Sequence, residues 1–230
     1  PYFQVEGISP DFESTTDQTG LNAQNIILDG KNVLVVMVEG LGAFANPAER
    51  ELFENALTAG LPANRYRFES GTTSYSGSTT AAATRELCGF WGDYTNFLEN
   101  KSYDCIPKRL KDSGIATHGW HAFSHDMFWR DVWWPRIGFE SLHFEEDILK
   151  SNAPNTDERC GTVFEGLCDL AVADLLHKNL VSGKAGQRFD YWLTLNTHIP
   201  YVAKNNGSLT CHASAAKIDN KMVCELSELW

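Results

Sequence analysis

Two long apolar runs, far apart in the chain, constrain its fold more than any other feature. Residues 33–38 read VLVVMV, and residues 189–195 read FDYWLTL. Runs of this length that are rich in β-branched and aromatic residues are typical of buried strands in largely parallel sheets. A helix is predicted over 46–60, because Pro47 lies near its start and Gly60 at its end. The chain therefore begins its core with a strand that is followed by a helix.

Further segments continue the alternation of strand and helix. The sequence predicts helices over 79–90, 105–114 and 162–180, and a strand over 115–123. One face of the helix over 162–180 collects apolar side chains: Phe164, Leu167, Ala171 and Leu175. We therefore expect an α/β fold in which a central, mostly parallel sheet is flanked by helices.

Charge and length exclude several kinds of partner. The chain has 230 residues and a net charge of −11, and its Lys and Arg residues form no basic stripe, so no nucleic-acid partner is expected. No apolar run reaches the roughly 18–20 residues of a membrane span. Residues 1–25 are polar, and we expect an irregular lead-in segment there. A single globular domain is then expected over 26–230.

The cysteines indicate an oxidising compartment. Six cysteines fall into close pairs: Cys88 with Cys105, Cys160 with Cys168, and Cys211 with Cys224. None of the pairs has the C-x-x-C spacing of a zinc knuckle. An even number of closely paired cysteines favours local disulfides over buried free thiols. We therefore expect an extracytoplasmic domain.

The segment SYSGSTTAAATREL, residues 74–87, crowds hydroxyl side chains immediately before a predicted helix. Ser and Thr are preferred helix N-caps, so this segment by itself is explained as a turn and a cap. The same geometry places a hydroxyl beside free backbone N–H groups and the positive end of a helix dipole, which favour an alkoxide or a phosphate. Such a hydroxyl can act as a nucleophile, above all beside a metal ion. Both interpretations stay open from this segment alone.

Polar side chains stand at the ends of both apolar runs. Glu39 follows the first run, and His198 follows the second within the sequence NTHIPY. In open parallel sheets, ligands bind beyond the carboxyl ends of the strands. Glu39 and His198 are therefore candidate functional residues.

Three histidines, His118, His121 and His125, lie at intervals of three and four residues. On a continuous helix this spacing would place all three on one face and predict a zinc site. Gly119 and the strand pattern over 115–123 disfavour such a helix. We therefore do not expect these residues to form a metal site of their own.

Four segments taken together resemble a known family. VLVVMVEGLG, GSTTAAATREL, HGWHAFSHDMFWRDVWWPRIGFE and TLNTHIPY occur in the order and spacing found in the extracytoplasmic domains of lipoteichoic acid synthases and lipid A phosphoethanolamine transferases. These proteins belong to the alkaline phosphatase/sulfatase superfamily, and the resemblance covers residues 32–201. The resemblance places a Thr at the nucleophile position, and a Thr cannot be oxidised to the formylglycine of true sulfatases. The resemblance therefore implies phosphoryl transfer through a covalent phospho-threonine.

The resemblance assigns a metal ligand and a nucleophile. Glu39 matches a Glu that binds a divalent metal, and Thr79 matches a Thr that is the nucleophile and also binds the metal. The glycerol-phosphate branch shows Gly-x-Thr with Arg six residues later, which selects Thr79 and Arg85, although Ala83 replaces an acidic residue. The phosphoethanolamine branch shows Gly-x-x-Thr-Ala, which selects Thr80 as the catalytic residue. We favour Thr79.

The resemblance also assigns a substrate-binding loop. His121 and Arg130 match residues that hold the lipid head-group phosphate, a task that suits the two-pronged donor geometry of Arg. Phe128 and Trp129 belong to the aromatic loop that lines the head group, and Phe128 stands where the synthases carry Trp. His198 matches a His that contacts the phosphate and protonates the leaving alcohol.

A divalent metal (Mn, Zn or Mg) is implied as the cofactor, together with an Asp-His pair of further ligands. No Asp-His dipeptide occurs in the chain, so we expect the natural protein to continue past Trp230 with these ligands and to carry a membrane anchor before Pro1. The implied function is transfer of phosphoglycerol or phosphoethanolamine from a phospholipid donor to a glycan or lipid acceptor, in the periplasm or at the outer face of the cytoplasmic membrane. A hydrolase of phosphate or sulfate esters and a non-catalytic glycan- or lipid-binding domain are the alternatives.

Overall fold

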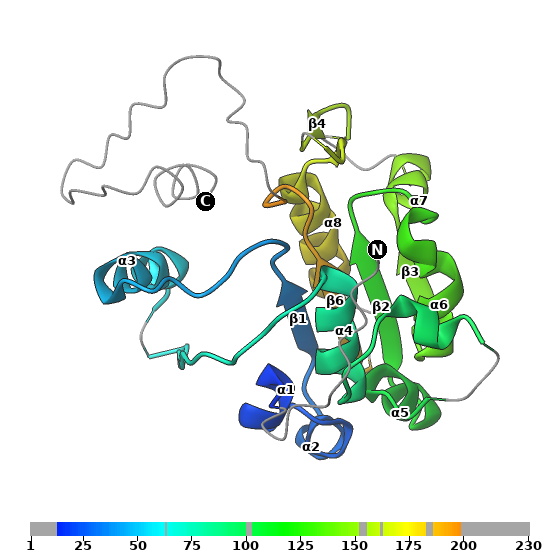
Figure 1. The fold of residues 1–230 in the computed structure, drawn as a ribbon, viewed down its shortest axis with the longest axis horizontal. Helices are drawn as coiled ribbons and strands as arrows, with labels where there is room; N and C mark the ends of the chain where they lie inside the picture. Colours follow the sequence, from blue (N-terminus) through cyan, green and yellow to red (C-terminus); the bar gives the residue numbers. More distant parts are fainter. Residues whose placement is uncertain are drawn as a thin grey trace.

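Four parallel strands form the central sheet of the computed structural model, which describes residues 13–62, 64–99, 103–151, 156–161, 163–182 and 186–198. Their order is β1-β6-β2-β3. The strands are β1 (Val33–Met37), β2 (Ala116–His121), β3 (Ser141–His143) and β6 (Arg188–Leu193). Helices cover both faces of this sheet (Figure 1). The expected α/β fold with a mostly parallel sheet is therefore confirmed.

The larger core lies on one face of the sheet. Phe189, Tyr191 and Leu193 alternate along β6 and point into this core, as the two-residue period of a strand requires. Trp133 and Trp134 from helix α6 (Arg130–Arg136) pack against them and are almost fully buried. Three other helices also contribute apolar residues to this core: α2 (Ala23–Asp29), α4 (Thr79–Cys88) and α5 (Ile106–Asp112).

A smaller core lies on the opposite face. It joins Trp120 of β2 and Trp192 of β6 to apolar residues of α7 (Glu145–Lys150) and α8 (Asp169–Val181). Helix α3 (Pro47–Thr58) behaves differently, because none of its residues is buried and it lies apart from the sheet, beyond β1 (Figure 1).

The helix predicted over 162–180 begins later than expected. Only Asp169–Val181 is helical, and Gly166–Leu167 instead forms strand β5, antiparallel to β4 (Arg159–Cys160). A Cβ atom at Gly166 would lie 2.3 Å from the carbonyl oxygen of Ala122, so only glycine allows this close backbone approach. The disulfide between Cys160 and Cys168 closes the same hairpin. Tertiary packing and a covalent link therefore override the apolar periodicity before Asp169.

The lead-in segment is also more ordered than expected. The short helix α1 (Thr15–Gln18) and the first three residues of α2 (Ala23–Asp29) lie in the segment 1–25 that was predicted to be irregular. Thr16 explains the first, because its backbone N–H donates to Glu86 Oε2 at 3.0 Å and its hydroxyl donates to the Glu86 carbonyl at 2.8 Å. Ile26 explains the second, because its side chain enters the larger core.

Two of the three predicted disulfides are confirmed. Cys88–Cys105 joins the end of α4 to the residue before α5, and Cys160–Cys168 precedes α8. The third predicted pair, Cys211 with Cys224, lies outside the described residues. Within the described part of the chain, every helix is too short or too polar to cross a membrane.

Candidate active site

Glu39 and Thr79, which the sequence singled out separately, are in direct contact. Glu39 lies two residues beyond the end of β1, and Thr79 is the first residue of α4. The Thr79 hydroxyl donates a hydrogen bond to Glu39 Oε1 at 2.9 Å. The contact lies beyond the carboxyl end of β1, where sites of α/β proteins form.

The turn after β1 is held against the end of β6. The Glu39 backbone N–H donates to Thr194 Oγ1 at 3.0 Å, just beyond the last residue of β6. Gly40 adopts a φ of +73°, and a Cβ atom there would lie 2.9 Å from the carbonyl oxygen of Thr197. Glycine is therefore required on both steric and conformational grounds. This close approach fixes Glu39 beside the segment that leads to His198.

The Glu39 carboxylate is buried without full compensation of its charge. Only 5% of the residue is exposed, and burial raises the pKa of Glu39 above its ordinary value. The hydrogen bond from Thr79 and the positive charges of Arg130 and His198 oppose this rise in pKa. A buried carboxylate of this kind gains most from a bound cation.

The two candidate nucleophiles face different surroundings. Thr79 is half-buried and points to Glu39, whereas Thr80 is 4% exposed and its hydroxyl lies 2.9 Å from Ser78 Oγ. Ser78 is the N-cap of α4, and its side chain accepts a hydrogen bond from the Ala81 N–H at 3.3 Å. Thr80 is therefore engaged with the helix cap, and Thr79 is the residue that reaches the acidic side chain.

Arg85 ties the hydroxyl-rich segment to α4. This buried side chain donates to Glu86 Oε1 at 2.7 Å and to the Ser74 carbonyl at 2.9 Å. Its guanidinium carbon also lies 4.5 Å from the ring centroid of Tyr75. Arg85 thus holds the segment that precedes Thr79 against α4.

His121 is held as a neutral imidazole at the end of β2. It is fully buried, and its Nδ1 lies 3.1 Å from the carbonyl oxygen of Leu193. A carbonyl only accepts, so Nδ1 carries the proton and Nε2 presents a lone pair. Burial, followed by the charge of Arg130, holds the pKa of His121 well below its ordinary value. Nε2 has no hydrogen-bond partner among the described residues.

Arg130 brings a buried positive charge to the same site from the first position of α6. It is 1% exposed, and it donates from Nη1 to the Met127 carbonyl at 3.3 Å. Its Nε and Nη2 atoms find no acceptor in the part of the chain that the structure describes. Burial lowers its pKa to about 10, and Glu39 opposes that change, so the side chain remains charged at neutral pH. Unused guanidinium donors of this kind favour an anionic ligand.

Phe128 and Trp129, the predicted lining of the head-group site, have an unusual backbone. Both residues have φ of 53°, in the left-handed region that bulky side chains rarely adopt. Phe128 is 40% and Trp129 57% exposed, whereas the next residue, Arg130, points inward. Such backbone strain is typical of functional loops. The Arg130 guanidinium carbon lies 5.3 Å from the Phe128 ring centroid, so the two side chains meet at the edge of the site.

His198 lies beyond the end of β6, where the sequence predicted it. Its backbone N–H donates to the Leu195 carbonyl at 3.1 Å, and its ring meets the Phe164 ring edge to face, with centroids 4.7 Å apart. Its positive charge lowers the pKa of Glu39, so the imidazole lies within electrostatic range of that carboxylate.

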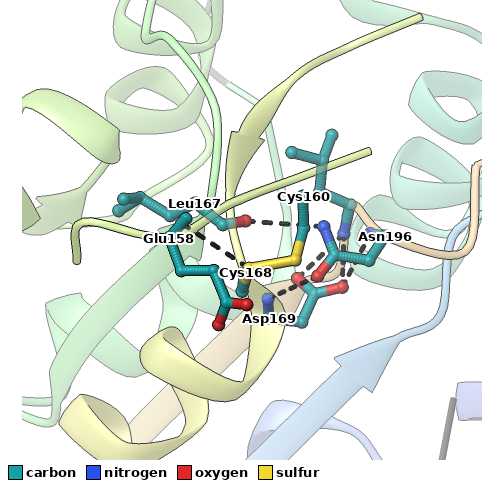
Figure 2. The surroundings of a disulfide bond; sticks show 7 residues. Glu158, Cys160, Leu167, Cys168, Asp169 and Asn196 are labelled. Atoms are coloured by element: carbon teal, nitrogen blue, oxygen red, sulfur yellow. Dashed lines mark hydrogen bonds between the residues drawn. A yellow bond between two sulfur atoms is a disulfide. The ribbon is translucent and has the colours of Figure 1, made fainter. Parts of the chain in front are cut away.

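Asp169, the first residue of α8, also belongs to this end of the sheet. Its carboxylate accepts hydrogen bonds from the backbone N–H groups of Leu195 and Asn196 at 3.0 and 2.7 Å (Figure 2). Burial raises the pKa of Asp169 to about 6, and these hydrogen bonds oppose the rise. Asp169 therefore anchors the segment that carries His198.

The residues beside Glu39 fit a hard divalent cation in chemical type, since a carboxylate and a hydroxyl are oxygen ligands. Within the described ranges, the only His, Asp and Glu side chains grouped closely enough to share a metal ion are His125, Asp126 and Asp131, which are partly or fully exposed and do not include Glu39. The described residues therefore provide two of the ligands that such an ion needs. His118 and His121 lie on opposite faces of β2, so these two histidines do not face a common site.

Comparison with solved structures identifies proteins that share this fold. No family model and no curated protein matches the chain by sequence. Among solved structures, the lipoteichoic acid synthase LtaP from Listeria monocytogenes superposes with a TM-score of 0.54 at 14% identity, over 87% of this chain and 51% of LtaP. An alkaline phosphatase superfamily protein from Vibrio parahaemolyticus gives 0.51 at 16% identity, over 86% of this chain and 48% of that protein.

The phosphoglycerol transferase GacH from Streptococcus pyogenes, solved in complex with sn-glycerol-1-phosphate, gives a TM-score of 0.52 at 15% identity, over 96% of this chain and 63% of GacH. The chain thus spans between 48% and 63% of the length of these structures. The sheet that brings Glu39, Thr79, His121 and Arg130 together has the fold of the alkaline phosphatase superfamily, as found in lipoteichoic acid synthase-like proteins.

Proposed function

We propose that this chain is the Thr79-bearing part of a metal-dependent phosphotransferase that moves phosphoglycerol from a phospholipid to a glycan or lipid acceptor. The observation that carries the proposal is the 2.9 Å hydrogen bond from Thr79 to the buried Glu39. The fold shared with LtaP and GacH supports the reaction class. The head group of GacH's ligand favours phosphoglycerol over phosphoethanolamine as the transferred group.

In the first half-reaction, Thr79 Oγ1 releases its proton to solvent and forms a bond to the phosphorus of the lipid phosphodiester. The bond between phosphorus and the diacylglycerol oxygen breaks, and the alcohol leaves with a proton. His198, at the exit of β6, is the candidate donor of that proton. In the second half-reaction an acceptor hydroxyl attacks the phospho-threonine, and Thr79 regains its proton.

The remaining side chains bind and orient the phosphodiester. Arg130 offers buried, unused N–H donors to the phosphate oxygens, and the lone pair on His121 Nε2 can accept a hydrogen bond from a hydroxyl of the head group. Glu39 and Thr79 would hold a divalent cation, which supplies the positive charge that lowers the pKa of the Thr79 hydroxyl when it is bound. Phe128 and Trp129 stand exposed at the edge of the site, where a lipid or glycan arrives.

The two disulfides support an extracytoplasmic location, since such bonds persist in oxidising compartments. In this proposal the donor lipid is in the outer leaflet of the cytoplasmic membrane, and the full-length protein is anchored to that membrane.

Capture of the covalent intermediate tests the proposal. The protein is loaded with Mn²⁺ or Zn²⁺ and incubated with phosphatidylglycerol vesicles. The tryptic peptide 68–85, which contains both Thr79 and Thr80, is then analysed by tandem mass spectrometry. We expect a phosphoglycerol adduct on Thr79 that Thr79→Ala abolishes and Thr80→Ala retains. An adduct from phosphatidylethanolamine instead would reassign the donor. Metal-loaded protein that forms neither adduct overturns the proposal, and phosphate ester hydrolysis without acceptor would favour the hydrolase.

A further inference from the structure

A fully buried tyrosine beneath the site has a hydroxyl without a partner. Tyr191 is in the middle of β6 and is 0% exposed, and its hydroxyl has no hydrogen-bond partner among the described residues. A polar group left unpaired in the core costs about 1–3 kcal/mol. Phenylalanine would fill the same space without that cost. A hydroxyl retained here indicates a hydrogen bond that forms in another state of the protein.

The packing around Tyr191 leads directly to Arg130. The neighbour of Tyr191 on β2 is Gly119, and a Cβ atom at Gly119 would lie 2.7 Å from the Trp134 ring. The absence of a side chain lets Trp134 rest on the sheet and meet Tyr191 edge to face, with ring centroids 5.7 Å apart. Arg130 precedes Trp134 by four residues on α6, so both residues lie on one face of that helix.

Arg130 is therefore one helical turn from Trp134, the residue whose ring packs against Tyr191. The two side chains also influence each other electrostatically, because the charge of Arg130 lowers the pKa of Tyr191 while burial raises it overall. Both are fully desolvated, and the guanidinium has unused donors at Nε and Nη2.

Among the buried unpartnered side-chain atoms near Arg130, His121 Nε2 and the Tyr191 hydroxyl oxygen can accept a hydrogen bond. The indole nitrogens of Trp133 and Trp134 are also unpartnered, but an indole N–H only donates. The phenol oxygen of Tyr191 accepts a hydrogen bond and still has a proton to donate. Its chemistry complements the guanidinium, whereas that of the two indoles does not.

We propose that Tyr191 is a positioning residue for Arg130: its hydroxyl oxygen accepts a guanidinium hydrogen bond when a phosphate ester binds, and this bond aims the remaining donors at the phosphate oxygens. This inference rests on the proposed function, in which Arg130 holds the phosphate. The ligand class is a phosphate monoester or diester with a small polyol head group.

The test compares Tyr191→Phe with Tyr103→Phe. The Tyr103 hydroxyl donates to the Asn96 carbonyl, and its ring packs on Phe97 in the same core, away from Arg130. Binding of sn-glycerol 1-phosphate to the metal-loaded protein is measured by calorimetry, and thermal unfolding is followed in parallel. We expect Tyr191→Phe to keep or raise Tm while weakening binding about 10-fold, the size of one hydrogen bond to a charged group. Tyr103→Phe should lower Tm and leave binding unchanged.

A second comparison separates positioning from packing. In an Arg130→Ala background, Tyr191→Phe should weaken binding no further, because the hydroxyl acts through the guanidinium. Equal affinity of wild type and Tyr191→Phe overturns this inference, as does a wild-type protein that binds no phosphate ester. Neither result decides the proposed function, which stands or falls on the covalent adduct at Thr79.

Discussion

Asp169 and Asn196 hydrogen-bond each other's backbone across the end of the sheet. Asn196 Oδ1 accepts from the Asp169 N–H at 2.6 Å, and Asp169 Oδ2 accepts from the Asn196 N–H at 2.7 Å (Figure 2). The start of α8 is thereby joined to the exit of β6, two residues before His198. The Cys160–Cys168 disulfide lies directly beside this pair. The Asp169–Asn196 pair therefore supports the segment that carries the candidate catalytic residue His198.

Removing the Asp169 carboxylate should destabilise this connection. Asp169→Ala leaves the N–H groups of Leu195 and Asn196 without their acceptor, and Leu195 is 1% exposed. We expect the free energy of unfolding to fall by about 2–3 kcal/mol in urea titrations at neutral pH. Asp174→Ala, an exposed position on the same helix, is the matched control and should change it by less than about 0.5 kcal/mol. Equal effects of the two changes would contradict the anchoring role.

Glu39→Gln should separate stability from activity. The amide oxygen still accepts the hydrogen bond from Thr79, but the buried negative charge is lost. Because burial raises the pKa of Glu39, removing its charge should leave Tm at pH 7.5 unchanged or higher. Affinity for Mn²⁺, measured by calorimetry, and formation of the Thr79 adduct should both be lost. A variant that binds Mn²⁺ as tightly as wild type would exclude Glu39 as a ligand.

The apolar runs predicted the strands β1 and β6, and the carboxyl ends of these strands predicted where Glu39 and His198 lie. Only β6 is buried as expected: β1 is at the end of the described sheet, and its Leu34 and Val36 are 42% and 40% exposed. The strand β1 and the helix α4 begin within a residue of the predicted positions. The direct contact between Glu39 and Thr79 follows from that topology once the strands are aligned.

Other features depend on contacts between distant segments, and no local pattern reports them. The start of α8 is set by the close backbone contact of Gly166 with Ala122 and by the Cys160–Cys168 disulfide. A prediction from apolar periodicity alone therefore began the helix several residues too early. Tyr191 stands within a run that reads as core, and its unpartnered hydroxyl becomes evident only when Trp134 and Arg130 are placed beside it.

The Cys88–Cys105 bond should contribute more to stability than the shorter link. It closes a separation of 17 residues, against 8 for Cys160–Cys168. Loop-closure entropy predicts that replacing both Cys88 and Cys105 by Ala lowers the free energy of unfolding by about 3 kcal/mol, and the second pair by about 2.5 kcal/mol. Adduct formation at Thr79 should respond in the opposite order, because the second pair supports the segment before His198. Urea unfolding and the adduct assay measure the two effects.

The His143 imidazole should make the protein sensitive to acid. It stacks on Trp120 with ring centroids 3.7 Å apart, and its Nε2 lies 3.3 Å from Nδ1 of His118. Burial, followed by the charge of His118, lowers the pKa of His143 to about 4. The unfolded chain takes up this proton near pH 6.5, so the contribution to stability is complete above that pH and is lost as the pH falls toward 4.

The loss amounts to at most about 3 kcal/mol for the change in pKa. Urea unfolding of wild type and His143→Gln at pH 7, 6 and 5 measures it, with His177→Gln on the exposed side of α8 as the matched control. The stability difference between wild type and His143→Gln should shrink steadily as the pH decreases. Parallel curves for these two proteins would contradict the assignment.

Gly119 should be the least replaceable position of β2. A Cβ atom there would lie 2.7 and 2.9 Å from two atoms of the Trp134 ring, which is buried and has no room to move. We expect Gly119→Ala to lower the free energy of unfolding by about 1–3 kcal/mol through overpacking. It should also weaken phosphate ester binding, because a displaced Trp134 moves α6 and with it Arg130. Gly42→Ala, where a Cβ atom meets nothing within 4 Å, is the control and should change neither property.

A double variant distinguishes overpacking from a backbone effect at Gly119. Trp134→Phe removes the part of the ring system that the new methyl group would strike, so Gly119→Ala should cost less in that background than in wild type. An equal loss in both backgrounds would show that the strand itself requires glycine. Recovery of phosphate ester binding together with stability would confirm that the Trp134 ring links the sheet to Arg130.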